Sequence, residues 1–353
     1  MAVAQSIRVM IVDDSAVYRG VMRQALAKDS SIQIVASATN GQNAIDELSK
    51  WDVDVVLLDL EMPVMDGLTA IPRIHAKRPH ARIVVASAFT AQGSERAVQA
   101  LTSGASDCVQ KPTTLGQGLS IEEYGKQLVA KVKQFARPGQ GMAPTLPVTP
   151  AVMQTPFHDG MPELLVIGSS TGGPNALTAF FKALPKKLPF PVALVQHMPP
   201  GFTQMLAQRL QADCGIPCVE ATNEQPLRPG VIHVAPGDKH LVIVGSQSSP
   251  VLRLTLDAPE NFCRPAVDPL FRSAAKVYGP GVLAVVLTGM GDDGARGSIE
   301  VARAGGRVMI QDEGSSVVWG MPGAVFRAGV AQLILPIAAL AERVTQMTGR
   351  KTT

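Results

Sequence analysis

Short apolar runs alternate with amphipathic stretches over the first 135 residues. Between the runs lie stretches such as Ala16–Lys28 and Ala44–Lys50, in which apolar side chains recur at helical spacing. Five strand–helix units of this kind predict a flavodoxin-like α/β fold, in which helices cover both faces of a five-stranded parallel sheet. The five predicted strands are Ile7–Val12, Ile32–Ala36, Val53–Leu58, Arg82–Ala86 and Asp107–Gln110.

A second α/β alternation begins after residue 162. Its predicted strands are Leu164–Ile167, Pro191–Val195, Val231–Ala235, Leu241–Val244, Val251–Leu256, Val282–Leu287 and Val308–Ile310. Its predicted helices are Ala176–Ala183, Gln204–Ala212, Pro269–Tyr278 and Ala295–Ala304. The strands that follow Val231 come in close succession, which favours a hairpin that interrupts the parallel order. We therefore predict a doubly wound α/β domain whose sheet is mostly parallel, with one hairpin.

The segment between the two alternations has a different composition. Residues 137–162 contain proline, glycine and small polar residues in place of a periodic apolar pattern. Because proline fixes φ and removes a backbone donor, such a segment builds neither a sheet nor a stable helix. We expect domains at residues 1–136 and 163–353, joined by a flexible linker.

Composition narrows the class of protein. Hydrophobic residues make up 46% of the 353, charged residues 17%, and the net charge is only +3. No basic stripe suits a nucleic acid, no apolar run is long enough for a membrane span, and the N-terminus lacks the features of a signal peptide. Four cysteines without paired spacing indicate free thiols rather than disulfides or zinc. We expect a cytoplasmic protein that is not inserted in a membrane.

Acidic residues and a lysine follow the strands of the first domain. Asp13 and Asp14 follow its first strand, Asp59 the third, Ser87 the fourth and Lys111 the fifth. Ligands of open parallel sheets bind at this edge, and clustered carboxylates repel one another unless a cation such as Mg²⁺ lies among them. Either of the first two aspartates alone would more simply cap a helix. Their coincidence with the other residues favours a site for Mg²⁺ and a phosphoryl group.

These motifs resemble the receiver domains of two-component signalling. The matching segments are residues 12–15 (VDDS), 57–67 (LLDLEMPVMDG), 86–88 (ASA) and 110–112 (QKP). The resemblance implies that a histidine kinase phosphorylates Asp59. It further implies that Asp13, Asp14, Asp59 and the backbone carbonyl of Glu61 hold Mg²⁺, while Ser87 and Lys111 contact the phosphoryl group. Receivers usually carry an aromatic switch residue where this chain has Cys108, which leaves the path of the signal open.

The second domain begins with a serine on a glycine-rich turn. Gly168, Ser170 and Gly172 fit the G-x-S-x-G pattern, which exposes a nucleophilic serine between a strand and a helix. A turn of this kind can also bind phosphate, although the G-K-[ST] ending of a P-loop is missing. The pattern alone leaves both alternatives open.

A serine nucleophile needs a base and an acid that orients the base. His197 follows the strand that ends at residue 195, whereas His233 lies within a strand and His240 precedes one. Asp292 and Asp293 follow another long apolar run, and the presence of both leaves Asp292 open as an alternative acid. Because Ser170, His197 and Asp293 all follow strands that we predict to be parallel, we expect them to meet at one edge of the sheet.

The second domain resembles the catalytic domain of the chemotaxis receptor methylesterases, the CheB family. Residues 168–174 (GSSTGGP), 196–202 (QHMPPGF), 233–240 (HVAPGDKH) and 287–294 (LTGMGDDG) carry the resemblance, which spans residues 163–347. It implies a serine hydrolase with Ser170 as nucleophile, His197 as general base and acid, and Asp293 as its orienting acid. The backbone N–H of Met290 would donate to the oxyanion.

The same resemblance predicts the reaction and the partners. The enzyme would hydrolyse glutamate methyl esters on methylated chemoreceptors and deamidate receptor glutamines, without a cofactor for the hydrolysis and as a monomer. Two alternatives remain at this point. The domain could bind a nucleotide at residues 168–174, or it could dock receptors without catalysis.

Overall fold

The computed structural model describes residues 6–87, 90–112, 120–135, 157 and 159–349. Its contacts divide the chain into two compact units, residues 1–146 and 147–353. Most of the predicted linker lies outside the described residues. Its last part contacts the second unit, because the Phe157 ring lies 5.2 Å from the Arg343 guanidinium and Asp159 pairs with Arg343.

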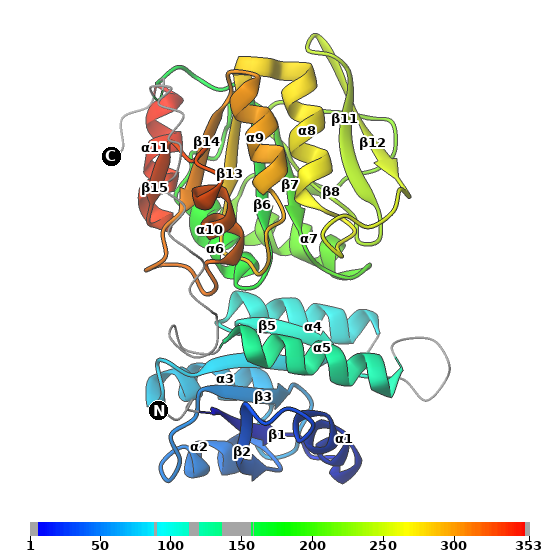
Figure 1. Cartoon of the computed structure of the whole chain (residues 1–353), viewed down its shortest axis with the longest axis vertical. Coiled ribbons are helices and arrows are strands. Elements are labelled where there is room, and N and C mark those ends of the chain that lie inside the picture. The colour runs from blue at the N-terminus through cyan, green and yellow to red at the C-terminus, as the bar shows by residue number, and fades with distance from the viewer. Residues whose placement is uncertain (1–5, 88–89, 113–119, 136–156, 158, 350–353) are drawn as a thin grey trace. The chain divides into compact units, whose positions relative to one another are not determined.

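The first unit is a five-stranded parallel sheet in the order β2-β1-β3-β4-β5 (Figure 1). Helices α1 and α5 pack together on one face, and α2, α3 and α4 follow one another on the other face. The strands are β1 (Ile7–Val12), β2 (Ile32–Ala38), β3 (Val55–Asp59), β4 (Arg82–Ser87) and β5 (Asp107–Gln110). The helices are α1 (Ala16–Leu26), α2 (Gly41–Glu47), α3 (Gly67–Lys77), α4 (Ala91–Thr102) and α5 (Ile121–Gln134).

Polar side chains set where the helices of the first unit begin. Each helix starts after a residue whose side chain accepts a hydrogen bond from a backbone N–H in the first turn, which satisfies a donor that the helix itself leaves unpaired. These residues are Ser15, Asn40, Asp66, Thr90 and Ser120. The strands and the ends of the helices are therefore fixed by local sequence, which is why the predicted strands match those observed to within three residues.

The second unit contains a seven-stranded parallel sheet in the order β15-β14-β13-β6-β7-β10-β8. Helices α8, α9 and α10 cover one face, and α6, α7 and α11 cover the other (Figure 1). The strands of this sheet are β6 (Leu164–Ser169), β7 (Val192–Gln196), β8 (Cys218–Glu220), β10 (Ile232–Val234), β13 (Val282–Val286), β14 (Arg307–Gln311) and β15 (Leu333–Leu335). The helices are α6 (Gly173–Lys182), α7 (Phe202–Cys214), α8 (Val267–Tyr278), α9 (Ala295–Arg303), α10 (Gly320–Arg327) and α11 (Ile337–Met347).

The predicted hairpin forms, but it belongs to a separate sheet. β11 (His240–Ser246) pairs antiparallel with β12 (Ser249–Thr255), and β12 pairs with the short β9 (Gln225–Pro226). Every strand pair of the seven-stranded sheet is parallel, so the hairpin does not interrupt it. Our expectation on that detail was wrong, because the apolar side chains of β11 pack on α8 rather than within the main sheet.

A continuous apolar core fixes the sheet of the second unit. All five residues of β13 are buried, as are all six of β6, which is typical of strands covered by helices on both faces. The carboxyl ends of β6, β7 and β13 lie side by side because these strands are neighbours in register. This edge carries the candidate active site.

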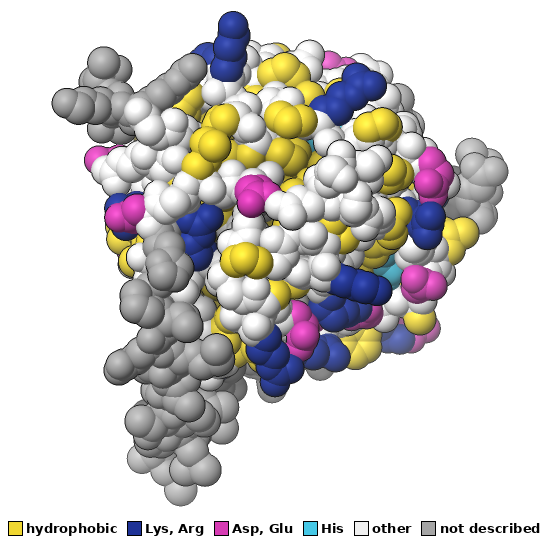
Figure 2. Space-filling view, turned by 90° about the horizontal axis from the view of Figure 1, so that it is seen from above, with side chains coloured by type: hydrophobic (Ala, Val, Ile, Leu, Met, Phe, Trp, Pro, Cys, Tyr) yellow, Lys and Arg dark blue, Asp and Glu magenta, His cyan; other side chains and the backbone are white. Residues whose placement is uncertain are grey.

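The outer surface shows no concentration of one charge on the face drawn in Figure 2. Basic and acidic side chains there are interspersed with hydrophobic and other polar ones. None of the helices in the described part of the chain is both long and apolar enough to cross a bilayer.

The core of the second unit predicts that alanine substitutions at two leucines have different effects on the stability of the protein. Leu270 of α8 is fully buried, whereas Leu256 is 69% exposed. We expect Leu270→Ala to lower the free energy of unfolding by about 2–5 kcal/mol, because it removes buried contacts and leaves a cavity. Leu256→Ala should change it by less than about 1 kcal/mol. Urea unfolding followed by Trp319 fluorescence, in a Trp51→Phe background, measures both; equal effects would contradict the packing described.

Candidate active site

A tight turn at the end of β6 presents Ser170. The Ser170 N–H donates to the Thr288 carbonyl at 3.0 Å, and the Ser170 carbonyl accepts from the Gly173 N–H at 2.7 Å. Gly172 has a φ of 77°, the left-handed region that glycine adopts without strain, and it directly precedes helix α6. The half-buried serine therefore sits between a strand and a helix, as the motif predicts.

The loop that follows β13 packs directly against this serine. A Cβ added at Gly289 would lie 2.8 Å from Ser170 Cβ and 3.0 Å from its backbone nitrogen. Only glycine allows so close an approach. The next residue, Met290, is 46% exposed, so its loop borders both the serine and the surrounding water.

A buried glutamine joins the serine turn to the histidine strand. Gln196 accepts from the Ser169 hydroxyl at 2.7 Å and donates to the Ser170 carbonyl at 2.9 Å. The His197 N–H in turn donates to the Ser169 carbonyl at 3.1 Å. These bonds hold residues 169, 170 and 197 in a fixed relation at the sheet edge.

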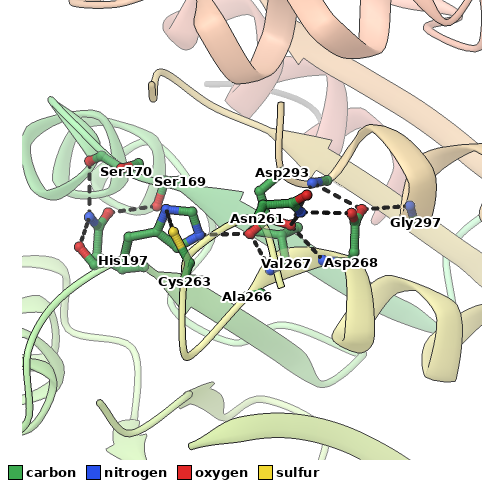
Figure 3. Close-up of polar contacts among 12 residues, drawn as sticks. Ser169, Ser170, His197, Asn261, Cys263, Ala266, Val267, Asp268, Asp293 and Gly297 are labelled. Atoms are coloured by element: carbon green, nitrogen blue, oxygen red, sulfur yellow. Dashed lines mark hydrogen bonds and ion pairs between the residues drawn. The ribbon is translucent and has the colours of Figure 1, made fainter. Parts of the chain in front are cut away.

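The imidazole of His197 pairs with a buried carboxylate. His197 Nε2 lies 2.7 Å from Asp293 Oδ2, and the Asp293 side chain is only 2% exposed (Figure 3). Asp292 is exposed at the surface of the same loop. Of the two adjacent aspartates, Asp293 is therefore the one that contacts His197.

Besides His197, Asp293 accepts hydrogen bonds from the start of α8, from Asn261 and from its neighbour Gly294. Its Oδ2 accepts from the Val267 N–H at 2.7 Å, and its Oδ1 from the Asp268 N–H at 3.0 Å. Both amides belong to the first turn of α8, where unpaired N–H groups favour an anion. Oδ1 also accepts from the Gly294 N–H at 2.9 Å and from Asn261 Nδ2 at 2.8 Å. The carboxylate therefore has a fixed orientation.

Asn261 links two buried carboxylates. Its Nδ2 lies 2.9 Å from Asp268 Oδ2 as well as 2.8 Å from Asp293 Oδ1 (Figure 3). Asp268 is fully buried, and its other oxygen accepts from the Gly294 and Gly297 N–H groups. The amide places a donor between two negative charges that would otherwise repel each other.

The second nitrogen of the imidazole faces a thiol. His197 Nδ1 lies 3.4 Å from Cys263 Sγ, while Nε2 contacts Asp293 (Figure 3). Within the described part of the chain, the Ser170 hydroxyl makes no hydrogen bond to either ring nitrogen. The structure therefore brings Asp293 and His197 together and sets Ser170 beside them, but Nδ1 is turned to Cys263. Sequence reasoning missed Cys263 and Asn261, because their segment carries no motif.

The surroundings change the acidity of both partners. Burial alone would lower the pKa of His197, but hydrogen bonds with Asp293 and Cys263 outweigh it and raise the pKa to about 10. Burial alone would raise the pKa of Asp293, yet its hydrogen bonds with His197 and backbone amides lower it. At neutral pH the imidazole is therefore protonated in this arrangement, and it becomes a base once its contacts change.

The other two histidines that the structure describes in this unit have structural roles. His233 is fully buried in β10, its Nε2 accepts from the Arg228 N–H at 3.3 Å, and burial lowers its pKa to about 4. His240 is also buried, and its Nδ1 accepts from the Ala266 N–H at 3.2 Å. Neither contacts Ser170 or Asp293.

The first unit gathers its predicted charged residues at one sheet edge. Lys111 Nζ lies 2.8 Å from Asp13 Oδ2 and 2.9 Å from Asp59 Oδ1, and all three residues are buried. Burial opposes the lysine's charge, but the two carboxylates raise the pKa of Lys111. Burial is the main reason that the pKa of Asp59 is raised. The side chain of Asp14 is exposed beside them.

These carboxylates fit a small hard cation. One oxygen from each of Asp13, Asp14 and Asp59 lies within 4.8 Å of the others, and oxygen ligands with access to water suit Mg²⁺. Glu61 follows two residues after Asp59 on the same loop, with its side chain exposed. Ser87 is buried at the end of β4 and donates to the Gly93 carbonyl at 2.7 Å. Cys108 lies on β5, where it pairs with β4 at Val85.

Comparisons with known proteins agree with both units. A family model described as CheB methylesterase matches residues 165–344, and one described as response regulator receiver domain matches residues 9–121. The chain belongs to the CheB methylesterase family. It carries a receiver domain ahead of the methylesterase domain, so the predicted family, fold class and enzyme class are confirmed.

Two relatives and one solved structure illustrate the match. A protein-glutamate methylesterase/protein-glutamine glutaminase of Rhodospirillum rubrum is 44% identical, over 98% of this chain and 96% of its own. One of a Nocardioides species is also 44% identical, with the same coverage. The crystal structure of the Thermotoga maritima CheB catalytic domain is 40% identical, with a TM-score of 0.51, and covers 52% of this chain and 98% of its own.

The raised pKa of His197 predicts how stability depends on pH. A histidine is ordinarily half-protonated near pH 6.5, so the pair with Asp293 contributes its full stabilisation below about that pH. That contribution is lost as the pH rises through about 10. We expect the free energy of unfolding of the wild-type second unit to fall between neutral pH and this value.

The matched variant is His197→Gln, which cannot titrate. Urea unfolding at a series of pH values, followed by Trp319 fluorescence in the Trp51→Phe background, should show a smaller fall for this variant than for the wild type. Parallel pH profiles of the two proteins would mean that His197 does not change protonation between the folded and unfolded states in this range.

Proposed function

We propose that this chain hydrolyses glutamate methyl esters on chemoreceptors and deamidates receptor glutamines, and that phosphorylation of its receiver domain controls the activity. The observation that carries this proposal is the 2.7 Å pair of His197 and Asp293 next to the serine turn. The names of the relatives state both activities. The alternative of a nucleotide site explains neither the buried His–Asp pair nor the family match.

In the proposed reaction, Ser170 attacks the ester carbonyl and His197 takes its proton. The imidazole then protonates the departing methanol, and a water molecule releases the acyl group from the serine by the same steps. Asp293 fixes the Nε2–H of the ring, so Nδ1 is the nitrogen that exchanges protons. General base catalysis of this kind contributes about 10²–10⁴-fold to the rate.

The oxyanion would form beside the loop of residues 289–291. We assign the Met290 N–H as its donor, because Gly289 already brings this loop against Ser170. One such donor is typically worth about 3 kcal/mol in the transition state. The amino end of α6, which begins three residues further along the chain from Ser170, favours negative charge in the same place.

The reaction requires His197 Nδ1 to give up its contact with Cys263 Sγ and to form a hydrogen bond with the Ser170 hydroxyl. Catalytic hydrogen bonds are often absent before substrate binds, and a serine side chain moves between three staggered rotamers at little cost. A rotation of Ser170 towards the ring, with displacement of the thiol, would lower the pKa of His197 because one of its hydrogen bonds is lost.

In the receiver domain, we assign Asp59 as the residue that accepts phosphate from a histidine kinase. Asp13, Asp14, Asp59 and the Glu61 carbonyl would hold Mg²⁺, which neutralises the phosphoryl oxygens during transfer. Lys111 and Ser87 would then bind the phosphoryl group. Lys111 already bridges two of these carboxylates, so it can exchange one anionic partner for another.

Three further assignments complete the proposal. The domain boundaries would be residues 1–136 and 163–353, with a linker at 137–162. The protein would act in the cytoplasm as a monomer, where its four thiols, free in the structure, stay reduced. Ester hydrolysis would need no cofactor.

Ser170→Ala should abolish ester hydrolysis, with a loss of about 10⁴–10⁶-fold in kcat, because it removes the proposed nucleophile. Methanol release from a methylated chemoreceptor measures it. Cys263→Ala is the matched control, since Cys263 Sγ is the group that contacts Nδ1 of the base in the structure. The Cys263→Ala protein should release methanol with a kcat of the same order as that of the wild type. The opposite result, activity lost only in Cys263→Ala, would make the thiol the nucleophile.

Asp59→Asn should remove activation by phosphorylation and leave basal methanol release intact, because it replaces the proposed phosphoryl acceptor with a neutral isostere. The measurement compares methanol release with and without acetyl phosphate and Mg²⁺. Asp66→Asn, at the cap of α3, is the control carboxylate and should respond like the wild type. Equal stimulation of Asp59→Asn and the wild type would exclude Asp59 as the acceptor.

A further inference from the structure

A tight turn of unusual composition precedes helix α8. The N–H of Glu260 donates to the Cys263 carbonyl at 3.1 Å, and the N–H of Cys263 donates to the Glu260 carbonyl at 2.8 Å. Both central residues are left-handed, with φ of 51° at Asn261 and 62° at Phe262. A two-residue turn of this kind normally carries Asn-Gly, because glycine adopts the second conformation freely. Here phenylalanine takes the place of glycine.

Phe262 has a conformation that costs stability and no contact that offsets the cost. A bulky residue at positive φ is strained. Its ring is fully exposed, at 103% of the reference value, so it gains nothing from packing. Residues held in this way cluster at functional sites, where the surrounding structure enforces the strain.

The rest of the turn is bound to the catalytic residues on both sides of Phe262. Asn261 donates to Asp293, and Cys263 Sγ contacts the imidazole of His197 (Figure 3). Glu260 is further held by two hydrogen bonds from Arg272, at 2.6 and 2.9 Å. The Phe262 ring therefore projects into water from a rigid support at the rim of the reaction centre.

A second exposed apolar side chain, that of Met290, lies on the loop that packs against Ser170. Met290 follows Gly289, which packs on Ser170, whereas Phe262 precedes Cys263, which contacts His197. A free amino acid ester would have no need for such contacts. A polypeptide must bring its backbone and neighbouring side chains across this rim before its ester reaches Ser170.

We propose that Phe262 is a specificity-determining residue that binds apolar side chains next to the ester-bearing glutamate of the receptor chain. The inference rests on the proposed function and names the part of the substrate that is recognised. An aromatic ring on a rigid turn suits this role, because little conformational freedom is lost when it binds.

Phe262→Gly tests the proposal, since it removes the ring and relieves the backbone. The full-length protein is assayed for kcat/KM on two substrates, a methylated chemoreceptor and the γ-methyl ester of N-acetylglutamate, and its Tm is measured. We expect a higher Tm, a loss of about tenfold on the receptor and a change within about twofold on the small ester. Phe262→Tyr, which keeps an aromatic ring, is the control and should retain activity on both.

Each other outcome overturns the inference in a distinguishable way. Unchanged activity of Phe262→Gly on the receptor would show that the ring does not bind substrate. An equal loss on both substrates would mean that the residue acts on His197 through the turn. Higher basal activity with no response to acetyl phosphate would make the receiver domain the partner of the ring. Failure of the wild type to release methanol from either substrate would reject the proposed function itself.

Discussion

The second unit depends on one buried carboxylate. Asp293 accepts hydrogen bonds from His197, from Asn261 and from three backbone amides, two of which begin helix α8. A carboxylate removed from water needs such a set of donors, since a buried charge without partners is strongly destabilising. The same bonds therefore stabilise the fold and orient the imidazole. Helix α8, the turn at residues 260–263 and the loop after β13 are all held in place by this one anion.

The two units bring their charged residues together in the same way. In each, parallel strands bring polar residues that are far apart in sequence to one edge of a sheet. The first unit neutralises Asp13 and Asp59 with the Lys111 ammonium. The second neutralises Asp293 with an imidazole, which can give up its proton. In both units, buried carboxylates are thus paired with a basic side chain that follows another strand of the same sheet.

The sequence predicted most of the strands and the edge at which the site residues gather, because both follow from apolar periodicity and parallel order. It did not predict the short strands β8, β9 and β15 or the helices α10 and α11. The strands are two or three residues long, and α10 begins with glycine and proline, so local patterns were too weak. The sequence favoured Asp293 without excluding Asp292, since adjacent residues differ only in which one the loop turns inward. Asn261 and Cys263 reach the site through a turn whose position depends on the packing of α8.

The protonation of His197 tests this account most directly. In a sample labelled with ¹⁵N at histidine and assigned with His197→Gln, NMR reports the proton on Nε2 and the pH at which the ring titrates. The account predicts a hydrogen-bonded Nε2 proton and a titration well above the ordinary range near pH 6.5, with both features lost in Asp293→Asn. An imidazole that titrates near its ordinary value, without a bonded Nε2 proton in the wild type, would contradict the central role given to Asp293.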